Sequence, residues 1–344
     1  MEQNLSEKEQ KRLNDYLLSI VDYDLFMVKD SIARGADVNA VDPIGKSALM
    51  LVAGSHTELP SIKAKDEDAV AVAMLFAFLD KKKEAQLKNR VRIMKTLIKH
   101  GANVFYVDPQ GLNVLTEAVM AENVDAIEYL IKKQISKNYR DFKGRTPLMY
   151  SVFYQKASSF FTLLDNGADV NLADKNGKTA LMFAVFKENM IFVEQLIEKG
   201  ANINAQDIFG NTVLMIAAHQ TNTFVLEKLL QKGAVVNTTN KDGKNALMFA
   251  VGNNQIKNIE KLIEYGIDIN HVDKFGNSAL SYAVLNNQED VVALLLEHGA
   301  EISQKLLEKV EDKKMKAILE SAIIERREKG QTAKITATEV ELTR

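Results

Sequence analysis

The sequence predicts an all-α solenoid, in which short helix–turn–helix repeats stack one after another. The first observation is a 33-residue period, in which an acidic or amide residue recurs and glycine follows it three positions later. The recurring residues are Asp108, Asp141, Asp174, Asp207, Asn240 and Asp273. A fixed period of this length indicates repeats that bury their apolar faces against one another, and not a globular enzyme domain.

The second observation is a helix start after every turn. The turn glycine, Gly177 in one repeat, stands where a tight turn after Asp needs positive φ. Two positions later comes Ser, Thr or Asn, which are preferred N-cap residues. These positions hold Ser47, Asn113, Thr146, Thr179, Thr212, Asn245 and Ser278. The pattern therefore predicts a first helix in every repeat.

The third observation is the apolar pattern of the two helices. The first helix carries a leucine such as Leu181, followed three and four positions later by small or β-branched residues, here Ala184 and Val185. Small residues at this spacing let neighbouring helices approach closely. The second helix has a broader apolar face and ends at a glycine such as Gly200, placed at C′. The Asp108 repeat alone lacks this glycine and has Gln134 instead.

These motifs resemble the ankyrin repeat family over roughly residues 9–305. The matching segments are the Asp-x-x-Gly turns, Thr146-Pro147-Leu148 and Gly167-Ala168-Asp169-Val170-Asn171. The resemblance implies repeats joined by β-turn fingers, and a concave surface of fingers and first helices. One departure concerns the residue after Pro-Leu, which is usually His in the family and is Met149 here. We expect the linkage between turns to be looser for that reason, and the periodic methionines to be core.

The domain organisation follows from the repeat register. We assign residues 1–41 to an N-terminal capping repeat, 42–107 to a repeat interrupted by an insertion at 57–89, 108–305 to six repeats of 33 residues, 306–329 to C-terminal capping helices, and 330–344 to a disordered tail. The C-terminal cap should be a short helix and then a longer one, which carries Met315, Ile318, Leu319, Ala322 and Ile323 on one face.

The insertion at 57–89 allows more than one interpretation. Its length equals one period, so it is either a decayed repeat or a true insertion between two helices. The absence of the Asp-x-x-Gly turn and of the Gly-Ala helix stop favours a true insertion. The apolar run 69–79 has acidic residues before it and lysines after it, as a helix prefers. Such a helix could lie on the array's own surface or dock a partner or a second copy, giving a homodimer.

Composition excludes several functional classes. The 44 basic and 46 acidic residues leave no cationic excess, so nucleic acid is not an expected partner. The absence of cysteine excludes disulfides and thiolate metal sites. No apolar run reaches the ~18 residues needed for a membrane span, and the polar N-terminal segment does not resemble a secretory leader. We expect a cytoplasmic location, with signal-independent export as the alternative.

No residue pattern predicts catalysis, a cofactor or a metal. The five histidines do not pair with a second candidate at ligand or catalytic spacing, and His271, in a turn between repeats, is expected to be exposed. The turn aspartates and glycines already have structural explanations. We therefore expect a non-enzymatic protein with no catalytic, cofactor-binding or metal-binding residues.

The residues left after subtracting structural positions are the candidates for partner binding. They lie at turn tips and on the open face of the first helices: Tyr139, Phe142, Phe153, Tyr154, Phe186, Lys187, Phe209, His219, Gln220, Phe275 and Leu285. Exposed aromatic residues often anchor protein interfaces, although Phe153 and Phe186 could instead be core. We predict a scaffold that binds an unidentified protein or peptide. The alternatives are a self-assembling protein that uses 57–89 and a regulatory subunit of an enzyme.

Overall fold

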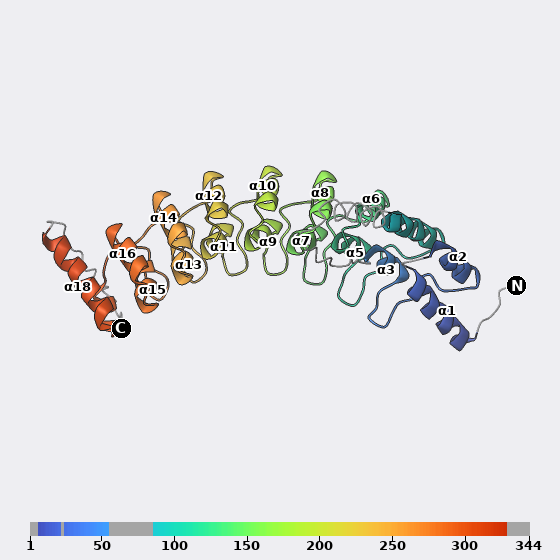
Figure 1. The fold of residues 1–344 in the computed structure, drawn as a ribbon, viewed down its shortest axis with the longest axis horizontal. Coiled ribbons are helices and arrows are strands. Elements are labelled where there is room, and N and C mark those ends of the chain that lie inside the picture. Colours follow the sequence, from blue (N-terminus) through green and yellow to red (C-terminus); the bar gives the residue numbers. More distant parts are fainter. Residues whose placement is uncertain (1–5, 22–23, 55–84, 329–344) are drawn as a thin grey trace, which may run out of the picture. The chain divides into compact units, whose positions relative to one another are not determined.

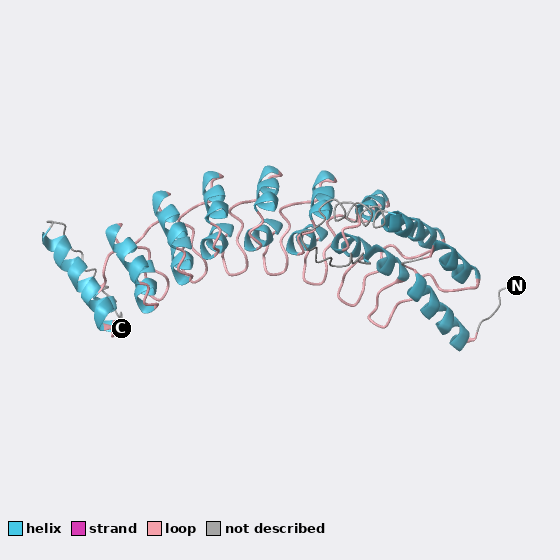
Figure 2. Cartoon of the chain, in the orientation of Figure 1, coloured by secondary structure: helices cyan, strands magenta, loops and turns pink. Residues whose placement is uncertain are grey.

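The structure is a computed structural model that describes residues 6–21, 24–54 and 85–328. The chain divides into two compact units, unit 1 (Met1–Lys175) and unit 2 (Asn176–Arg344). All extended regular elements within the described residues are helices, and β-pairing there is limited to isolated single-residue bridges (Figure 2). The predicted all-α class is therefore confirmed.

Unit 1 contains the N-terminal helices and the first repeats. Its helices are α1 (Glu7–Ile20), α2 (Leu25–Ala33), α3 (Ala48–Gly54), a helix over 85–99, α5 (Val114–Met120), α6 (Val124–Lys132), α7 (Pro147–Phe153) and α8 (Ala157–Asp165). The helix over 85–99 includes residues 85–89, which the sequence alignment placed in the insertion. The rest of that insertion, including 69–79, lies outside the described residues.

Unit 2 contains two parallel rows of helices (Figure 1). The first helices are α9 (Ala180–Phe186), α11 (Val213–His219), α13 (Ala246–Gly252) and α15 (Ala279–Leu285). The second helices are α10 (Met190–Glu198), α12 (Thr223–Gln231), α14 (Ile256–Glu264) and α16 (Glu289–Glu297). Long loops project from the first row on one side, and each loop carries an Asp-x-x-Gly turn, or Asn-x-x-Gly at Asn240 (Figure 2). We call these loops the fingers.

Two classes of glycine shape each repeat, and they differ in what surrounds them. Gly177, in a finger, has φ of 73°, and a Cβ placed on it would lie 2.9 Å from Asp207 Cα of the next finger. Gly200, after α10, has φ of 85° but no atom within 4 Å of such a Cβ. In the Asp108 repeat Gln134 adopts φ of 67° at the equivalent position. At the helix stop glycine is therefore favoured only by the positive φ. In the finger it is also favoured because the next finger leaves no room for a Cβ.

Backbone hydrogen bonds link successive fingers. In unit 2 the donor is the backbone N–H of the residue directly after the turn Asp or Asn. The acceptor is a carbonyl of the preceding finger, that of the second residue after its own turn Asp or Asn. The pairs are Ile208 to Asn176 at 2.9 Å, Lys241 to Phe209 at 2.8 Å and Lys274 to Asp242 at 3.0 Å. In unit 1 the Lys175 N–H donates to the Lys143 carbonyl at 2.9 Å. The backbone therefore supplies a linkage that methionine side chains cannot make.

Asparagine side chains form a second set of links between the repeats of unit 2. Asn237 donates to the Gly266 carbonyl at 3.2 Å and accepts from the Asp268 N–H at 2.7 Å. Asn270 makes the same two contacts one repeat later, with Gly299 and Glu301. Because each asparagine satisfies one donor and one acceptor of the next loop, these bonds fix the spacing between repeats a second time.

The core is formed by the leucines and methionines of the first helices together with the apolar faces of the second helices. The methionines expected to be core are all buried: Met50, Met149, Met182, Met215 and Met248. At the C-terminal end α17 (Gln304–Lys309) and α18 (Lys313–Glu328) follow the last repeat. Met315 and Leu319 of α18 are buried. The predicted tail at 330–344 lies outside the described residues.

None of the helices described combines the length and the apolar character needed to cross a bilayer.

Candidate partner-binding surface

Three predicted aromatic residues are exposed in the Asp141 repeat of unit 1. Phe142, at the finger tip, is 58% exposed, and Phe153 and Tyr154, at the end of α7, are 40% and 49% exposed. The rings of Phe153 and Tyr154 meet edge to face at 5.2 Å between centroids. Tyr154 also stacks on the buried Tyr150 at 6.1 Å. We call Phe142, Phe153 and Tyr154 the aromatic cluster; Phe153 is a surface residue and not core.

The finger beneath the aromatic cluster is held by a buried carboxylate. Asp141 Oδ1 accepts from the backbone N–H groups of Lys143 and Arg145, both at 2.8 Å. Its Oδ2 accepts from the Tyr150 hydroxyl at 2.7 Å and pairs with the Arg145 guanidinium at 2.9 Å. Burial alone would raise the pKa of Asp141, but these donors and the cation outweigh it and lower the pKa. Phe142 therefore stands on a rigid finger.

Tyr139 lies in the same finger but is half-buried, and its hydroxyl is engaged. It donates to the Gly111 carbonyl of the preceding finger at 2.7 Å, as Tyr106 does to Gly45. In unit 2 His271 occupies the same place, with Nε2 2.6 Å from the Gly243 carbonyl. The expectation that His271 is simply exposed is therefore wrong: the ring is half-buried and bonded to the preceding finger. Because a carbonyl can only accept, Nε2 is the donor. Each of these three side chains ties its finger to the one before.

In unit 2 the structure brings Phe209 and His219 to the same place. Both line a hollow of about 380 Å³ with Met248 and Phe249 of α13. Phe209 is 60% exposed at its finger tip, and His219 is the exposed last residue of α11. A hollow of this kind between a finger and two first helices can receive a single side chain of a partner.

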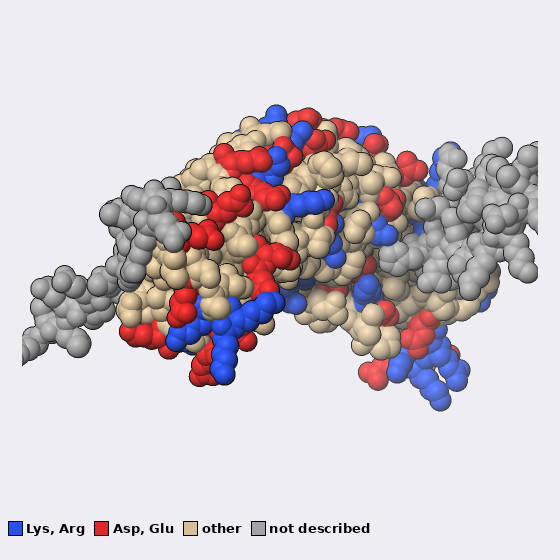
Figure 3. Space-filling model, turned by 60° about the vertical axis from the view of Figure 1, so that its left-hand side comes forward, with Lys and Arg blue, Asp and Glu red and all other residues tan. Residues whose placement is uncertain are grey.

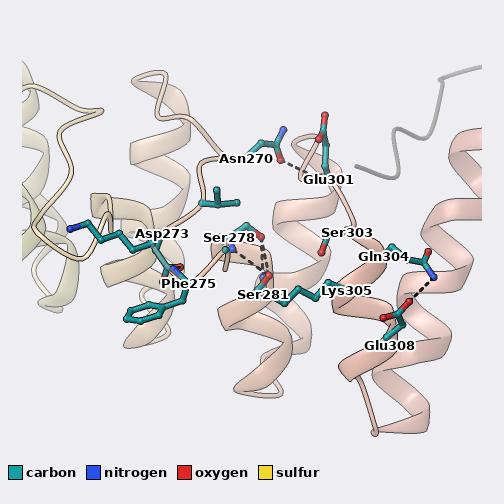
Figure 4. A pocket seen from close by; sticks show the side chains of 13 residues that line it. Asn270, Asp273, Phe275, Ser278, Ser281, Glu301, Ser303, Gln304, Lys305 and Glu308 are labelled. Atoms are coloured by element: carbon teal, nitrogen blue, oxygen red, sulfur yellow. Dashed lines mark hydrogen bonds between the residues drawn. The ribbon is translucent and has the colours of Figure 1, made fainter. Parts of the chain in front are cut away.

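The remaining predicted residues of unit 2 occupy different environments. Phe186, the last residue of α9, is exposed and not core, and Lys187 follows it as the half-buried C-cap. Gln220 is the half-buried C-cap of α11. Phe275 and Leu285, in the last repeat, are both exposed. Phe275 lines a larger cavity at the C-terminal end, together with residues of α17 (Figure 4).

Comparison with known protein families identifies the family of this chain. A family model described as ankyrin repeats (3 copies) matches residues 84–174, 155–240 and 214–305, which together extend over well more than half of the sequence. The chain belongs to the ankyrin repeat family. A search of curated proteins found no match. Ankyrin repeats generally mediate protein–protein interaction, and proteins built from them are typically non-enzymatic scaffolds.

Sequence reasoning missed one position of the ankyrin array that bears on the fingers. The residue nine positions after the turn Asp is Tyr150 in one repeat and Tyr282 in another, and each hydroxyl donates to that Asp. In the Asp108 repeat the equivalent residue is Glu117. The two tyrosines at the same register were visible in the sequence and could have revealed this contact.

Glu117 is buried beside Asp108, and its environment is unusual. Its carboxylate pairs with the Lys46 ammonium at 2.9 Å and has 3% of its surface exposed. Burial raises its pKa, and the ion pair with Lys46 only partly opposes this. Asp108 Oδ2 is also buried and, among the described residues, receives no hydrogen bond. Two carboxylates therefore lie together with one ammonium group.

Charged side chains of both signs lie close together on the second helices of unit 2. Lys228 pairs with Glu194 at 2.5 Å, and Lys314 of α18 pairs with Glu289 at 2.7 Å. On the face shown in Figure 3, basic side chains lie beside acidic ones across the described residues. Neighbouring charges of opposite sign do not create one large basic area. A surface of this kind is better matched by the mixed charges of another protein.

Proposed function

We propose that this ankyrin array is a non-enzymatic scaffold that binds a protein or peptide through its fingers and first helices. The aromatic cluster supports the proposal most strongly. Phe142, Phe153 and Tyr154 expose large apolar rings although each sits on a finger or helix end that the core holds in place. Rigid aromatic residues lose little conformational freedom on binding and are frequent hot spots.

Two further observations support the same surface. The hollow lined by Phe209 and His219 offers a place for an anchoring side chain in unit 2. Exposed Phe186 and Leu285 lie at the ends of α9 and α15, the same helix position that Phe153 occupies in α7. Lys187, Gln220 and Phe275 would supply contacts at the edge of this surface. A cytoplasmic location belongs to the proposal as well.

The experiment uses the full chain as bait and one matched pair of variants. Partners retained by the wild type are identified by mass spectrometry, and the affinity of the purified partner is measured. Phe153→Ser with Tyr154→Ser should weaken binding by about 10- to 100-fold, the loss of a hot spot. Phe224→Ser is the control, because Phe224 is 75% exposed but lies on the second helix α12.

The outcome separates binding from folding. Thermal unfolding of both variants should stay close to the wild type, since the substituted rings are substantially exposed. An unchanged affinity of the double variant would contradict the proposal, and so would an equal loss in the Phe224 variant. Self-assembly through 57–89 and a regulatory-subunit role stay hypotheses.

A further inference from the structure

The finger stack of unit 2 ends at an open slot. The last finger carries Asp273, and 33 residues later the chain is already in α17 instead of forming another finger. Between this finger and α17 lies a cavity of about 760 Å³. One wall is the finger and the start of α15, and the other wall is the segment from Glu301 to Glu308 (Figure 4). We call this cavity the end slot.

The interior fingers show what such a slot accepts. Over Gly210 stand Asn240 Cα and Lys241 N of the next finger, at 3.2 and 2.9 Å from a Cβ placed on the glycine. Over Gly243 stand Asp273 and Lys274 in the same way. In unit 2 an Asp-X or Asn-X turn therefore covers each interior finger glycine, and the N–H of residue X donates to the finger below.

The last finger lacks this cover. Around a Cβ placed on Gly276 the one atom within 4 Å is Lys305 Nζ, at 3.7 Å. The Phe275 carbonyl, equivalent to the bonded carbonyls of Phe209 and Asp242, receives no backbone N–H from any described residue. The Phe275 ring is 66% exposed and Val272 beside it is 51% exposed. An acceptor and an apolar contact are thus both open at the end slot.

The lysine nearest to Gly276 points to an acidic group on the ligand. Lys305 extends from α17 towards Ser281 (Figure 4), and within the described residues its ammonium has no carboxylate within 4 Å. Three acidic residues also line the slot: Asp273 is bonded within its own finger, Glu308 accepts from Gln304, and the Glu301 carboxylate points away from Lys305 (Figure 4). A carboxylate that enters over Gly276 would meet Lys305 first.

A second copy of this chain fits the end slot less well than a turn that has its own N–H. Its first finger has Pro43 directly after Asp42, and proline has no N–H to donate to the Phe275 carbonyl. The Asp108 finger, with Pro109 at the same position, covers Gly45 with the proline ring and without such a bond. Interior fingers such as that of Asp207 already use this N–H. A turn of a different polypeptide is therefore the occupant that can supply the N–H as the interior fingers of unit 2 do.

We propose that the end slot binds an acidic turn of a partner protein, which stacks on the last finger as each interior finger stacks on the one before it. The turn donates one backbone N–H to the Phe275 carbonyl, packs on the Phe275 ring and places a carboxylate against Lys305. The site is distinct from the aromatic cluster, so each can be tested without the other.

The test titrates peptides into the isotopically labelled full chain and follows backbone amide shifts. The probe is a synthetic peptide with the sequence of residues 203–214, which contains the Asp207 turn. Three peptides change Ile208, the position whose N–H would meet Phe275: Ile208→Glu, Ile208→Lys and Ile208→Pro. Shift changes should be confined to residues 270–281 and 301–308. We expect dissociation constants of about 0.1 to 1 mM for linear peptides, with the Glu peptide tightest.

Two comparisons decide the outcome. The Pro peptide should bind at least about tenfold more weakly, because it lacks the donor, and Lys305→Glu should reverse the preference between the Glu and Lys peptides. The Phe153→Ser, Tyr154→Ser variant should bind these peptides as the wild type does. The proposal is overturned if no peptide shifts the slot residues at millimolar concentration, if the Pro peptide binds equally well, or if Lys305→Glu leaves the preference unchanged.

Discussion

Two neighbouring repeats of unit 1 solve the same problem with different chemistry. In the Asp141 repeat the turn carboxylate accepts from Tyr150 and pairs with Arg145, so both of its oxygens are satisfied. In the Asp108 repeat the carboxylate still closes the turn, through the N–H groups of Gln110 and Leu112, but its second oxygen faces a region shared with Glu117. The same backbone therefore tolerates a satisfied and an unsatisfied buried charge.

The two repeats differ in how much their buried carboxylates stabilise the folded state. A buried carboxylate with matched donors stabilises the finger, whereas two neighbouring buried carboxylates oppose each other's ionisation. The Asp108 repeat also follows the interrupted repeat, and the hypothetical Cβ of Gly54, where α3 ends, would lie 2.4 Å from Glu117 Oε2. The less stable arrangement thus lies where the chain departs into the insertion.

Removal of the two turn carboxylates should have the largest and most unequal effect. Asp141→Ala leaves a buried hydroxyl, a guanidinium and two turn N–H groups without their acceptor, and we expect a loss of about 3 kcal/mol in the free energy of unfolding. Asp108→Ala loses its turn bonds but also relieves repulsion with Glu117, so the loss should be about half as large. Urea unfolding of both variants at pH 7 measures the difference; equal losses would show that the carboxylates are equivalent.

The second effect is a difference in pH dependence. The raised pKa of Glu117 means that its contribution to stability is fully present below its usual value of 4.5 and is lost as pH rises through the folded-state pKa. The lowered pKa of Asp141 works in the opposite direction: its contribution is present above the usual value of 3.8 and is lost as pH falls through the folded-state pKa.

Glu117→Gln isolates the first of these two groups. A neutral amide can donate to Asp108 without being ionised, so this variant should be about 1.5 kcal/mol more stable than the wild type at pH 7.5 and no more stable at pH 4. Chemical denaturation at the two pH values measures this. Glu128→Gln on α6 is the control, because Glu128 is half exposed, and it should show little change at either pH. A destabilised Glu117 variant at pH 7.5 would mean that the Lys46 pair dominates.

Loss of the Tyr150 hydroxyl should have a smaller effect. Tyr150→Phe removes one donor from Asp141 Oδ2 but leaves the Arg145 guanidinium in place, so we expect a cost of about 1 kcal/mol. Tyr154→Phe provides the comparison, since Tyr154 is half exposed and should change stability by less than about 0.5 kcal/mol. If the two variants unfold at the same denaturant concentration, the hydroxyl contact with Asp141 does not stabilise the finger.

The smallest effect concerns the helix stops of the same two repeats. Gln134→Gly should gain about 0.5 kcal/mol, because glycine adopts positive φ without a steric penalty. The reverse change in the neighbouring repeat, Gly167→Gln, should cost about 1 kcal/mol, because Gly167 has φ of 72°. The cost should be no larger, because a Cβ there meets nothing nearer than Lys137 Nζ at 3.6 Å. Thermal unfolding of the pair measures both signs; a loss on Gln134→Gly would point to contacts of the glutamine side chain.

Much of the fold was predictable because the repeat register fixes backbone roles. Thr146 and Thr179 cap their helices with bonds of 3.3 Å to Met149 and Met182, as their position after the turn glycine predicts. The register also placed Phe142 and Phe209 at finger tips, where they are exposed. Local chemistry was sufficient for these positions.

The site was less predictable, because register does not say where a side chain points. Tyr139 and Phe142 both belong to the same finger, yet the Tyr139 hydroxyl turns back to the preceding finger. The hollow beside Phe209 depends on Met248 and Phe249 of the next repeat, which no pattern within one repeat reveals. The end slot arises where the period stops, so a search for the period passes over it.

The links between repeats have a consequence for how the chain could change in length. In unit 2 the backbone links between fingers, such as Ile208 to Asn176, and the asparagine links, such as Asn237 to Gly266, recur from one repeat to the next. Excision of residues 207–239 would therefore join surfaces that already fit each other. Growth or loss by whole modules keeps both sets of links in register, whereas a deletion of any other length would misalign both sets at once.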